Sequence, residues 1–168
     1  FWRTSDGGKN WENTTDTLVV SGVESLSVNP SDNNDILIAV RQGGNANTHG
    51  LFRSSDGGTT WFETKFNPLA TSFGGLGRNH RIYKIAFHPT RTGIIYIGTS
   101  NGMYLSKDNL QTWTLVFSGR NTDMEFHPTN PARIYAYDNY QSDRNYLKYS
   151  NDTGKTWNNS ALIADNNN

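Results

Sequence analysis

Three stretches of the chain alternate apolar and polar residues and then end in proline. They are Leu26–Pro30, Ile85–Pro89 and Met124–Pro128. A period of two is typical of a β-strand, and proline ends such a strand. A polar turn follows each stretch, and then an apolar run rich in β-branched and aromatic residues: Ile36–Val40, Ile94–Ile97 and Ile134–Tyr137. That composition predicts a second strand, buried on both faces.

Each unit continues with a third short strand and a sharply defined motif. The third strands are Leu51–Arg53, Met103–Leu105 and Leu147–Tyr149. The motif, Ser/Thr-x-Asp-x-x-x-x-Trp, is called here the Asp turn, and its copies are Thr4–Trp11, Ser54–Trp61, Ser106–Trp113 and Ser150–Trp157. The copies recur roughly 50 residues apart, and a period of that size indicates a repeat architecture.

The Asp turn has a physical interpretation as a tight hairpin between the third and fourth strands. The aspartate accepts hydrogen bonds from backbone N–H groups a residue or two further on, and Gly8, Gly58 and Gly154 allow a positive φ. The tryptophan begins the next strand and covers the hairpin. Leu110 replaces the glycine in the third copy, which predicts either the worst-formed turn or a different conformation. A structural role is therefore assigned to Asp6, Trp11, Asp56, Trp61, Asp108, Trp113, Asp152 and Trp157.

Four antiparallel strands in roughly 40 to 50 residues match one blade of a β-propeller. The sequence thus predicts an all-β chain, with a hairpin at 1–17 and full blades at 23–66, 82–117 and 122–163. A β-sandwich is the alternative, but it does not explain a repeating unit. Closure takes at least about four blades, so we expect an incomplete propeller and remaining blades in a larger protein.

The motifs resemble the Asp-box, or bacterial neuraminidase, repeat. That repeat occurs in sialidases, xyloglucan-hydrolysing propeller enzymes, sortilin-type receptors and many secreted bacterial proteins. The pattern His-Pro-Thr-x-x-x-x-Ile-Tyr, at His88–Tyr96 and His127–Tyr135, is most similar to the xyloglucanase and sortilin branch. The resemblance implies a propeller fold, whereas its members include both enzymes and binding proteins.

Composition narrows the partners. The chain has 15 basic and 15 acidic residues and no cluster of Lys or Arg, which argues against nucleic acid as a partner. No apolar run is long enough to span a bilayer, and no cysteine is present for disulfide or thiol chemistry. The abundance of Asn, Ser, Thr, Gly and aromatic residues is typical of secreted or cell-surface β-proteins, and we expect a bacterial source.

In a propeller, the loops after the second and fourth strands gather on one face. Here they span 42–50, 67–81, 118–123 and 138–146. Aromatic side chains that stack on sugars and planar donors for hydroxyls or carboxylates suit a carbohydrate or polypeptide ligand. The candidate ligand-binding residues are Phe73, Arg78, Asn79, His80, Tyr140 and Arg144. For the longest of these loops, 67–81, the alternative is a flexible connector between blades.

A glycoside hydrolase would need two carboxylates on that face. The candidate catalytic acids are Asp138, Asp143, Asp123 and Glu24. The xyloglucanases that the chain resembles carry an aspartate near the end of the second strand, as Asp138 does, but follow it with two glycines rather than Asn139-Tyr140. We expect Asp138 and Asp143 to be solvated and ionised, which favours a ligand-binding scaffold. A hydrolase fragment is the alternative, xyloglucanase-like rather than sialidase, because no Arg-Ile-Pro segment is present.

The histidines and aspartates give no metal site. His88 and His127 occupy the same repeat position before proline, which indicates a structural role in each blade. His49 and His80 lie in separate loops without ligand spacing. The Asp turns lack the glutamate that completes a calcium loop. The sequence therefore predicts neither a metal nor a cofactor.

Overall fold

A computed structural model describes residues 1–16, 18, 20–42, 50–66, 81–138 and 146–160 of the chain. In these ranges the regular structure consists of β-strands. The strands are β1 (Trp2–Arg3), β2 (Glu12–Asn13), β3 (Val20–Asn29), β4 (Asp32–Gln42), β5 (Gly50–Ser54), β6 (Phe62–Glu63), β7 (Ile82–Phe87), β8 (Ile95–Thr99), β9 (Gly102–Ser106), β10 (Thr114–Ser118), β11 (Asn121–His127), β12 (Asn130–Asp138), β13 (Tyr146–Ser150) and β14 (Asn158–Asn159). No candidate membrane-spanning helix occurs among the described residues.

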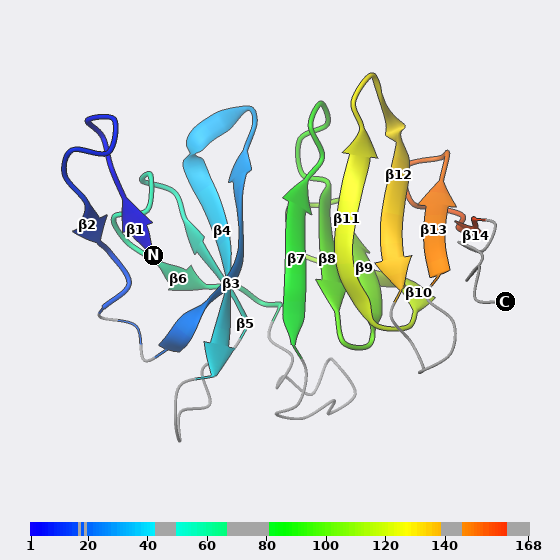
Figure 1. Cartoon of the computed structure of the whole chain (residues 1–168), viewed down its shortest axis with the longest axis horizontal. Helices are drawn as coiled ribbons and strands as arrows, with labels where there is room; N and C mark the ends of the chain where they lie inside the picture. Colours follow the sequence, from blue (N-terminus) through cyan, green and yellow to red (C-terminus); the bar gives the residue numbers. More distant parts are fainter. Residues whose placement is uncertain (17, 19, 43–49, 67–80, 139–145, 161–168) are drawn as a thin grey trace, which may run out of the picture.

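The strands form one hairpin and three four-stranded antiparallel sheets. Hairpin I pairs β1 with β2, sheet II runs β3-β4-β5-β6, sheet III runs β7-β8-β9-β10, and sheet IV runs β11-β12-β13-β14. Strands that are neighbours in the chain are also neighbours in each sheet. The sheets stand side by side in chain order, from the blue hairpin to the orange end of sheet IV (Figure 1). The predicted all-β repeat of four-stranded units is confirmed.

The core lies between the sheets. Each second strand supplies apolar side chains to one or both of its faces, and the resulting clusters fill the spaces between neighbouring sheets. Ile36, Ile38 and Val40 pack toward hairpin I. Leu37 and Ala39, on the other face of β4, pack against sheet III. A third cluster, centred on Tyr96, Met103 and Leu105 of sheet III and on Met124, Ile134 and Ala136 of sheet IV, joins those two sheets.

The prediction of second strands buried on both faces is correct for β4 and β8 and wrong for β12. Ile36–Val40 and Ile95–Thr99 are buried throughout. In β12, Ile134 and Ala136 are buried while Tyr135 and Tyr137 remain partly exposed. The reason is that, among the described residues, sheet III covers only the Ile134 face of sheet IV.

The tryptophans of three Asp turns reach across to the preceding sheet. In each case the indole meets an aromatic ring edge-on. The pairs are Phe1–Trp61 (ring centroids 5.3 Å apart), Phe66–Trp113 (5.1 Å) and Phe117–Trp157 (4.9 Å). Trp11 and Trp157 also donate through Nε1 to a carbonyl of their own turn, Gly8 and Gly154. The tryptophan therefore holds its hairpin and also ties it to the neighbouring sheet.

In the Asp turns, one carboxylate oxygen accepts from backbone amides further along the turn. Asp56 Oδ1 accepts from Thr59 N and Thr60 N, both at 2.9 Å, while its Oδ2 accepts from Thr60 Oγ1 at 2.6 Å. The amides lie three and four residues on, further than predicted. The leading hydroxyl, Ser54 Oγ, accepts from Gly58 N at 2.8 Å. The hydroxyl and the carboxylate each accept hydrogen bonds from backbone amides of the turn, which explains why every copy of the motif has Ser or Thr first and Asp third.

The third Asp turn keeps the conformation of the others without their glycines. Asn109 has φ 60° and Leu110 has φ 66°, where the second turn has Gly57 at 71° and Gly58 at 87°. The alternative of a different conformation is therefore wrong. Leu110 tolerates the left-handed region because its side chain is 3% exposed and packs in the cluster between sheets II and III.

The turn between the first and second strands lies beside the Asp turn of the same sheet. The residue before proline caps it by accepting from the amide two positions on: Ser31 N to Asn29 Oδ1 (3.0 Å), Thr90 N to His88 Nδ1 (3.2 Å) and Thr129 N to His127 Nδ1 (3.4 Å). The amide after each aspartate then bonds to this turn: Gly57 N to Asn34 O (3.0 Å), Asn109 N to Gly93 O (2.9 Å) and Thr153 N to Ala132 O (2.9 Å). This edge of the sheets is called here the turn end, and the opposite edge the loop end.

Candidate functional site

The candidate site predicted from the sequence lies at the loop end. Much of it falls on loops outside the described residues. The candidates so placed are Phe73, Arg78, Asn79, His80, Tyr140, Asp143 and Arg144. The structure does place three candidate acids, Glu24, Asp123 and Asp138, together with the side chains around them. Glu24 is an exposed residue of β3, opposite β4 at an irregularity in the pairing.

Asp123 belongs to an ion cluster that joins sheets III and IV. Lys84 Nζ, from β7, lies 2.9 Å from Asp123 Oδ1 and 3.0 Å from Glu125 Oε1, both on β11. Burial alone would lower the pKa of Lys84, but hydrogen bonds and charge from the two carboxylates outweigh it, so its pKa is raised. Lys84 therefore stays charged and ties β7 to β11 through both carboxylates.

Asp138 is buried, which contradicts the expectation that it is solvated. Its side chain is 7% exposed, and Lys148 Nζ lies 3.5 Å from Oδ2. Alternate residues of a strand share a face, so Asp138 points the same way as Ala136, toward sheet III. A Cβ at Gly119 would lie 2.5 Å from Asp138 Oδ1, so the carboxylate needs glycine at that position.

Lys148 is fixed by more than its carboxylate. Its Nζ donates to Asn159 Oδ1 at 3.0 Å and lies 5.5 Å from the centre of the Phe117 ring. An ammonium above an aromatic face is attracted by the ring electrons. Asp138 Oδ1 has no hydrogen-bond partner among the described residues. The Asp138–Lys148 ion pair therefore lies against Phe117 of sheet III, and Oδ1 of Asp138 is the carboxylate oxygen without a partner there.

In the described part of the chain, each of the two acids is paired with a different lysine. Asp123 is bound by Lys84, and Asp138 is bound by Lys148 on the side that faces sheet III. A glycosidase needs one carboxyl protonated near neutral pH, and a neighbouring ammonium favours the ionised form instead. Sequence reasoning had not singled out Lys84, Lys148 or Gly119. The signal available was only that both lysines lie on strands: Lys84 finds its partner in another sheet, and Lys148 finds Asp138 on the neighbouring strand of its own sheet.

Across the described residues, no group of three or more histidine, aspartate or glutamate side chains is arranged to hold a metal ion. The aspartates of the Asp turns are bound to their own turns instead. Hydrogen bonds from Asn10, and from Thr4, lower the pKa of Asp6 to about 2. The pKa values of Asp56 and Asp152 are lowered further, first by the hydroxyls of Thr60 and Thr156. These carboxylates are therefore ionised near neutral pH and close their turns by accepting hydrogen bonds.

A family model described as "Sortilin, neurotensin receptor 3" matches the chain twice, over residues 1–121 and 49–165. The chain belongs to the Sortilin-Vps10 family. Two overlapping matches to one model agree with the internal repeat of the sheets.

Curated relatives of the chain are xyloglucanases. It is 29% identical over 146 residues to a probable oligoxyloglucan-reducing end-specific xyloglucanase of Neosartorya fischeri, covering 81% of the chain and 17% of the relative. It is 29% identical over 141 residues to xyloglucanase Xgh74A of Acetivibrio thermocellus, covering 74% and 16%. The chain thus spans less than a fifth of the length of these relatives.

Solved structures agree on the fold. The GH74 xyloglucanase from Xanthomonas campestris superposes with a TM-score of 0.67 at 20% identity, over 98% of the chain and 27% of that protein. The structure titled "YCF48 bound to D1 peptide" superposes with a TM-score of 0.55 at 16% identity, over 88% and 43%. With the sheet order described above, the fold is three four-stranded blades and one hairpin of an incomplete β-propeller.

Proposed function

We propose that the chain is part of an exported or cell-surface β-propeller that binds a carbohydrate without cleaving it. The loop end, where Asp123 and Asp138 lie, is the proposed binding face. Its ligand is a neutral plant-type glucan of the xyloglucan class. The observation that carries the proposal is the pairing of Asp123 and Asp138 with separate lysines.

This pairing favours binding over hydrolysis for a chemical reason. A general acid must hold its proton near neutral pH, which takes burial away from cations or the company of a second carboxylate. Lys84 and Lys148 work in the opposite direction. Ionised carboxylates are instead good acceptors for sugar hydroxyls, and Lys84 is a ready donor beside Asp123 and Glu125.

The ligand class is supported by the relatives rather than by the site. The curated relatives act, by their names, on xyloglucan or its oligosaccharides. A chain with equal numbers of acidic and basic residues suits a neutral polysaccharide. A polypeptide ligand is the alternative, supported by the family model described as a neurotensin receptor and by likeness at 16% identity to a peptide-bound structure.

The second candidate function is a segment of a propeller glycoside hydrolase. The similarity to four xyloglucanases favours it. In that case Asp138 would be the first residue to examine, since it ends the second strand of its blade and keeps one carboxylate oxygen without a hydrogen-bond partner among the described residues.

Affinity electrophoresis tests the proposed ligand. The protein should be retarded in a gel that contains tamarind xyloglucan, and should migrate normally in a matched gel that contains polygalacturonate. A charge-swapped Lys84→Glu variant should lose the retardation, because it places a third carboxylate beside Asp123 and Glu125. Lys107→Glu, a change at the turn end, is the matched control. Normal migration of the wild type in xyloglucan would contradict the proposal.

A further inference from the structure

Hollows open between neighbouring sheets at the turn end, and three of them are equivalent by the repeat. Each is lined by the residue before the Ser/Thr of one Asp turn, by the residue after its tryptophan, and by the Asp turn of the next sheet. They are called here wedge I–II (Arg3, Glu12 and Gly57), wedge II–III (Arg53, Phe62 and Asn109) and wedge III–IV (Leu105, Thr114 and Gly154). The repeat therefore supplies internal comparisons for each position.

In wedge I–II the polar groups are engaged with one another. Arg3 Nη1 donates to Gly57 O and to Thr59 Oγ1, both at 2.9 Å, while its Nη2 lies 3.0 Å from Glu12 Oε2. Wedge III–IV has leucine and threonine in place of the arginine and the aromatic residue. Neither wedge has an arginine and an aromatic residue at the two positions that Arg53 and Phe62 occupy in wedge II–III, although Lys107, Trp113 and Lys155 line wedge III–IV.

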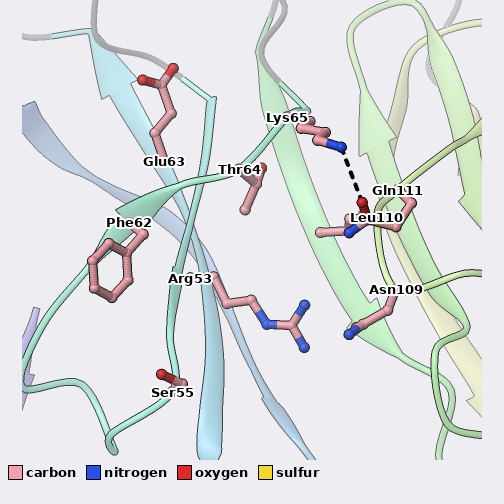
Figure 2. A pocket seen from close by; sticks show the side chains of 9 residues that line it. All are labelled: Arg53, Ser55, Phe62, Glu63, Thr64, Lys65, Asn109, Leu110 and Gln111. Atoms are coloured by element: carbon pink, nitrogen blue, oxygen red, sulfur yellow. Dashed lines mark hydrogen bonds between the residues drawn. The ribbon is translucent and has the colours of Figure 1, made fainter.

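Wedge II–III differs from both. It has a volume of about 260 Å³ and is lined by Arg53, Ser55, Phe62, Glu63, Thr64, Lys65, Asn109, Leu110 and Gln111. Figure 2 shows the strand that carries Phe62 on one side and Asn109, Leu110 and Gln111 on the other, with the guanidinium of Arg53 pointing toward Asn109. The hollow is therefore walled by an aromatic ring, a guanidinium and two planar amides.

Phe62 is the apolar element of this wedge. It is 63% exposed, although the equivalent positions after the other tryptophans hold the polar residues Glu12, Thr114 and Asn158. Phe62 is directly opposite Arg53 across the β5–β6 pair, so the ring and the arginine share one face of the sheet. A ring exposed at a position that is otherwise polar offers a surface on which an apolar sugar face can stack.

The polar walls of the wedge are held in place. Arg53 makes a two-pronged ion pair with Asp35, with Nε 2.6 Å from Oδ1 and Nη2 2.7 Å from Oδ2. Lys65 Nζ donates to Gln111 Oε1 at 3.1 Å, which leaves the NH₂ group of Gln111 as a donor. Arg53 is paired with Asp35, and the formal charges of Arg53, Asp35, Glu63 and Lys65 sum to zero, so the wedge carries no net formal charge.

We propose that wedge II–III is a second binding site, for one ring of a neutral oligosaccharide. The ring stacks on Phe62, and its hydroxyls bond to Arg53, Asn109 and Gln111. The site lies at the turn end, at the edge of the sheets opposite the acids of the loop end. It shares only its ligand class with the proposed function.

Calorimetric titration of the protein with cellotetraose, a neutral oligosaccharide, tests this site. Phe62→Ala should weaken cellotetraose binding about tenfold or more, the loss expected for one stacking contact. Thr114→Ala changes the equivalent position of wedge III–IV and should leave the affinity unchanged. Equal affinities of the wild type and Phe62→Ala, or no cellotetraose binding by the wild type, would overturn the proposal.

Asn109→Gly separates a lost contact from damage to the fold. Asn109 has a positive φ, and the equivalent residue of the second turn is Gly57, so glycine should leave the protein as stable as before or more stable. The same change removes the side-chain amide that lines the wedge and should weaken cellotetraose binding several-fold. Loss of stability together with loss of binding would assign Asn109 to the fold and count against the site.

Two further readouts separate this site from the loop end and from another kind of ligand. Xyloglucan retardation that survives in Phe62→Ala, with cellotetraose binding lost, supports both sites. Cellotetraose-induced NMR shifts at the backbone amides of Lys84 and Asp123, with none at Asn109 or Gln111, would leave the proposed function standing and overturn the wedge. Binding of a hexaglutamate peptide that needs Phe62, without cellotetraose binding, would make the wedge a site for acidic peptides and overturn the carbohydrate assignment.

Discussion

At the residue scale, a single carboxylate in each Asp turn accepts the hydrogen bonds that close the turn. The sequence correctly predicted that aspartate would accept backbone hydrogen bonds, but it placed the donors too close. The actual donors to Asp152, Lys155 N and Thr156 N, lie three and four residues on. That distance depends on the left-handed pair Thr153 and Gly154, which no periodicity reveals.

The carboxylates of the Asp turns should make stability depend on acid. Their pKa values in the folded state lie below the ordinary value of 3.8 for aspartate, so folding is favoured while they are ionised. Their contribution is complete above about pH 4 and is lost as the pH falls through the folded-state pKa values. Urea midpoints measured from pH 5 to pH 2 should fall, and the fall should be smaller in Asp56→Ala. An identical decline in both proteins would contradict this origin.

His88 should add a second acid-sensitive step at higher pH. Burial, and then the charge of Arg91, lower its pKa below the ordinary value of 6.5. Its Nδ1 accepts hydrogen bonds from Thr90 N and Arg91 N. A proton on Nδ1 would point at these two N–H donors and break both bonds. The lowered pKa means that stability is complete above about pH 6.5 and declines as the pH falls below it.

His88→Asn is the matched variant for that step, because Asn29 caps the equivalent turn of sheet II. The melting temperature of the wild type should fall more between pH 7.5 and pH 5 than that of His88→Asn. If both proteins lost the same amount, the histidine would not be the titrating group.

At the element scale, the strands and the repeat could be predicted, and the contacts between sheets could not. A period of two and the Asp turns located the strands because both are local. The burial of β12 and of Asp138 depends on which face meets a neighbouring sheet, and that follows from packing. Likewise, Asp123 was a candidate from its loop position, but its partner Lys84 lies in another sheet.

The tryptophans allow the contact between sheets to be measured. Trp11 and Trp157 each donate to a carbonyl of their own turn, but only Trp157 also meets a ring of the preceding sheet, Phe117. Trp11 is 58% exposed. Trp157→Ala should therefore lower the free energy of unfolding by about 3 kcal/mol, the lower end of the range for large aromatic truncations.

Urea denaturation of the two variants side by side makes the comparison. Trp11→Ala should cost clearly less than Trp157→Ala, since it loses the bond within the turn but no ring of a preceding sheet. Equal costs would mean that the tryptophan stabilises only its own hairpin.

At the scale of the whole molecule, the sheets bury their faces against one another and leave apolar side chains at the margins. Trp2, Trp11, Leu26 and Val28 are among the exposed large hydrophobic residues. Exposed apolar surface and free strand edges favour association. The 168-residue chain expressed alone should therefore form oligomers or aggregates, as judged by light scattering at micromolar concentration. A monodisperse monomer that melts sharply would contradict this expectation.

The central claim is that this propeller segment binds a glucan without hydrolysing it. The most direct measurement is an assay of new reducing ends during incubation of the protein with xyloglucan, run with the wild type, Asp138→Asn and Asp152→Asn. Asp138 is the buried partner of Lys148 at the loop end, whereas Asp152 closes an Asp turn at the opposite end. The account predicts retention on xyloglucan and no new reducing ends with any of the three proteins. Turnover by the wild type that is abolished in Asp138→Asn and kept in Asp152→Asn would contradict it and establish the hydrolase.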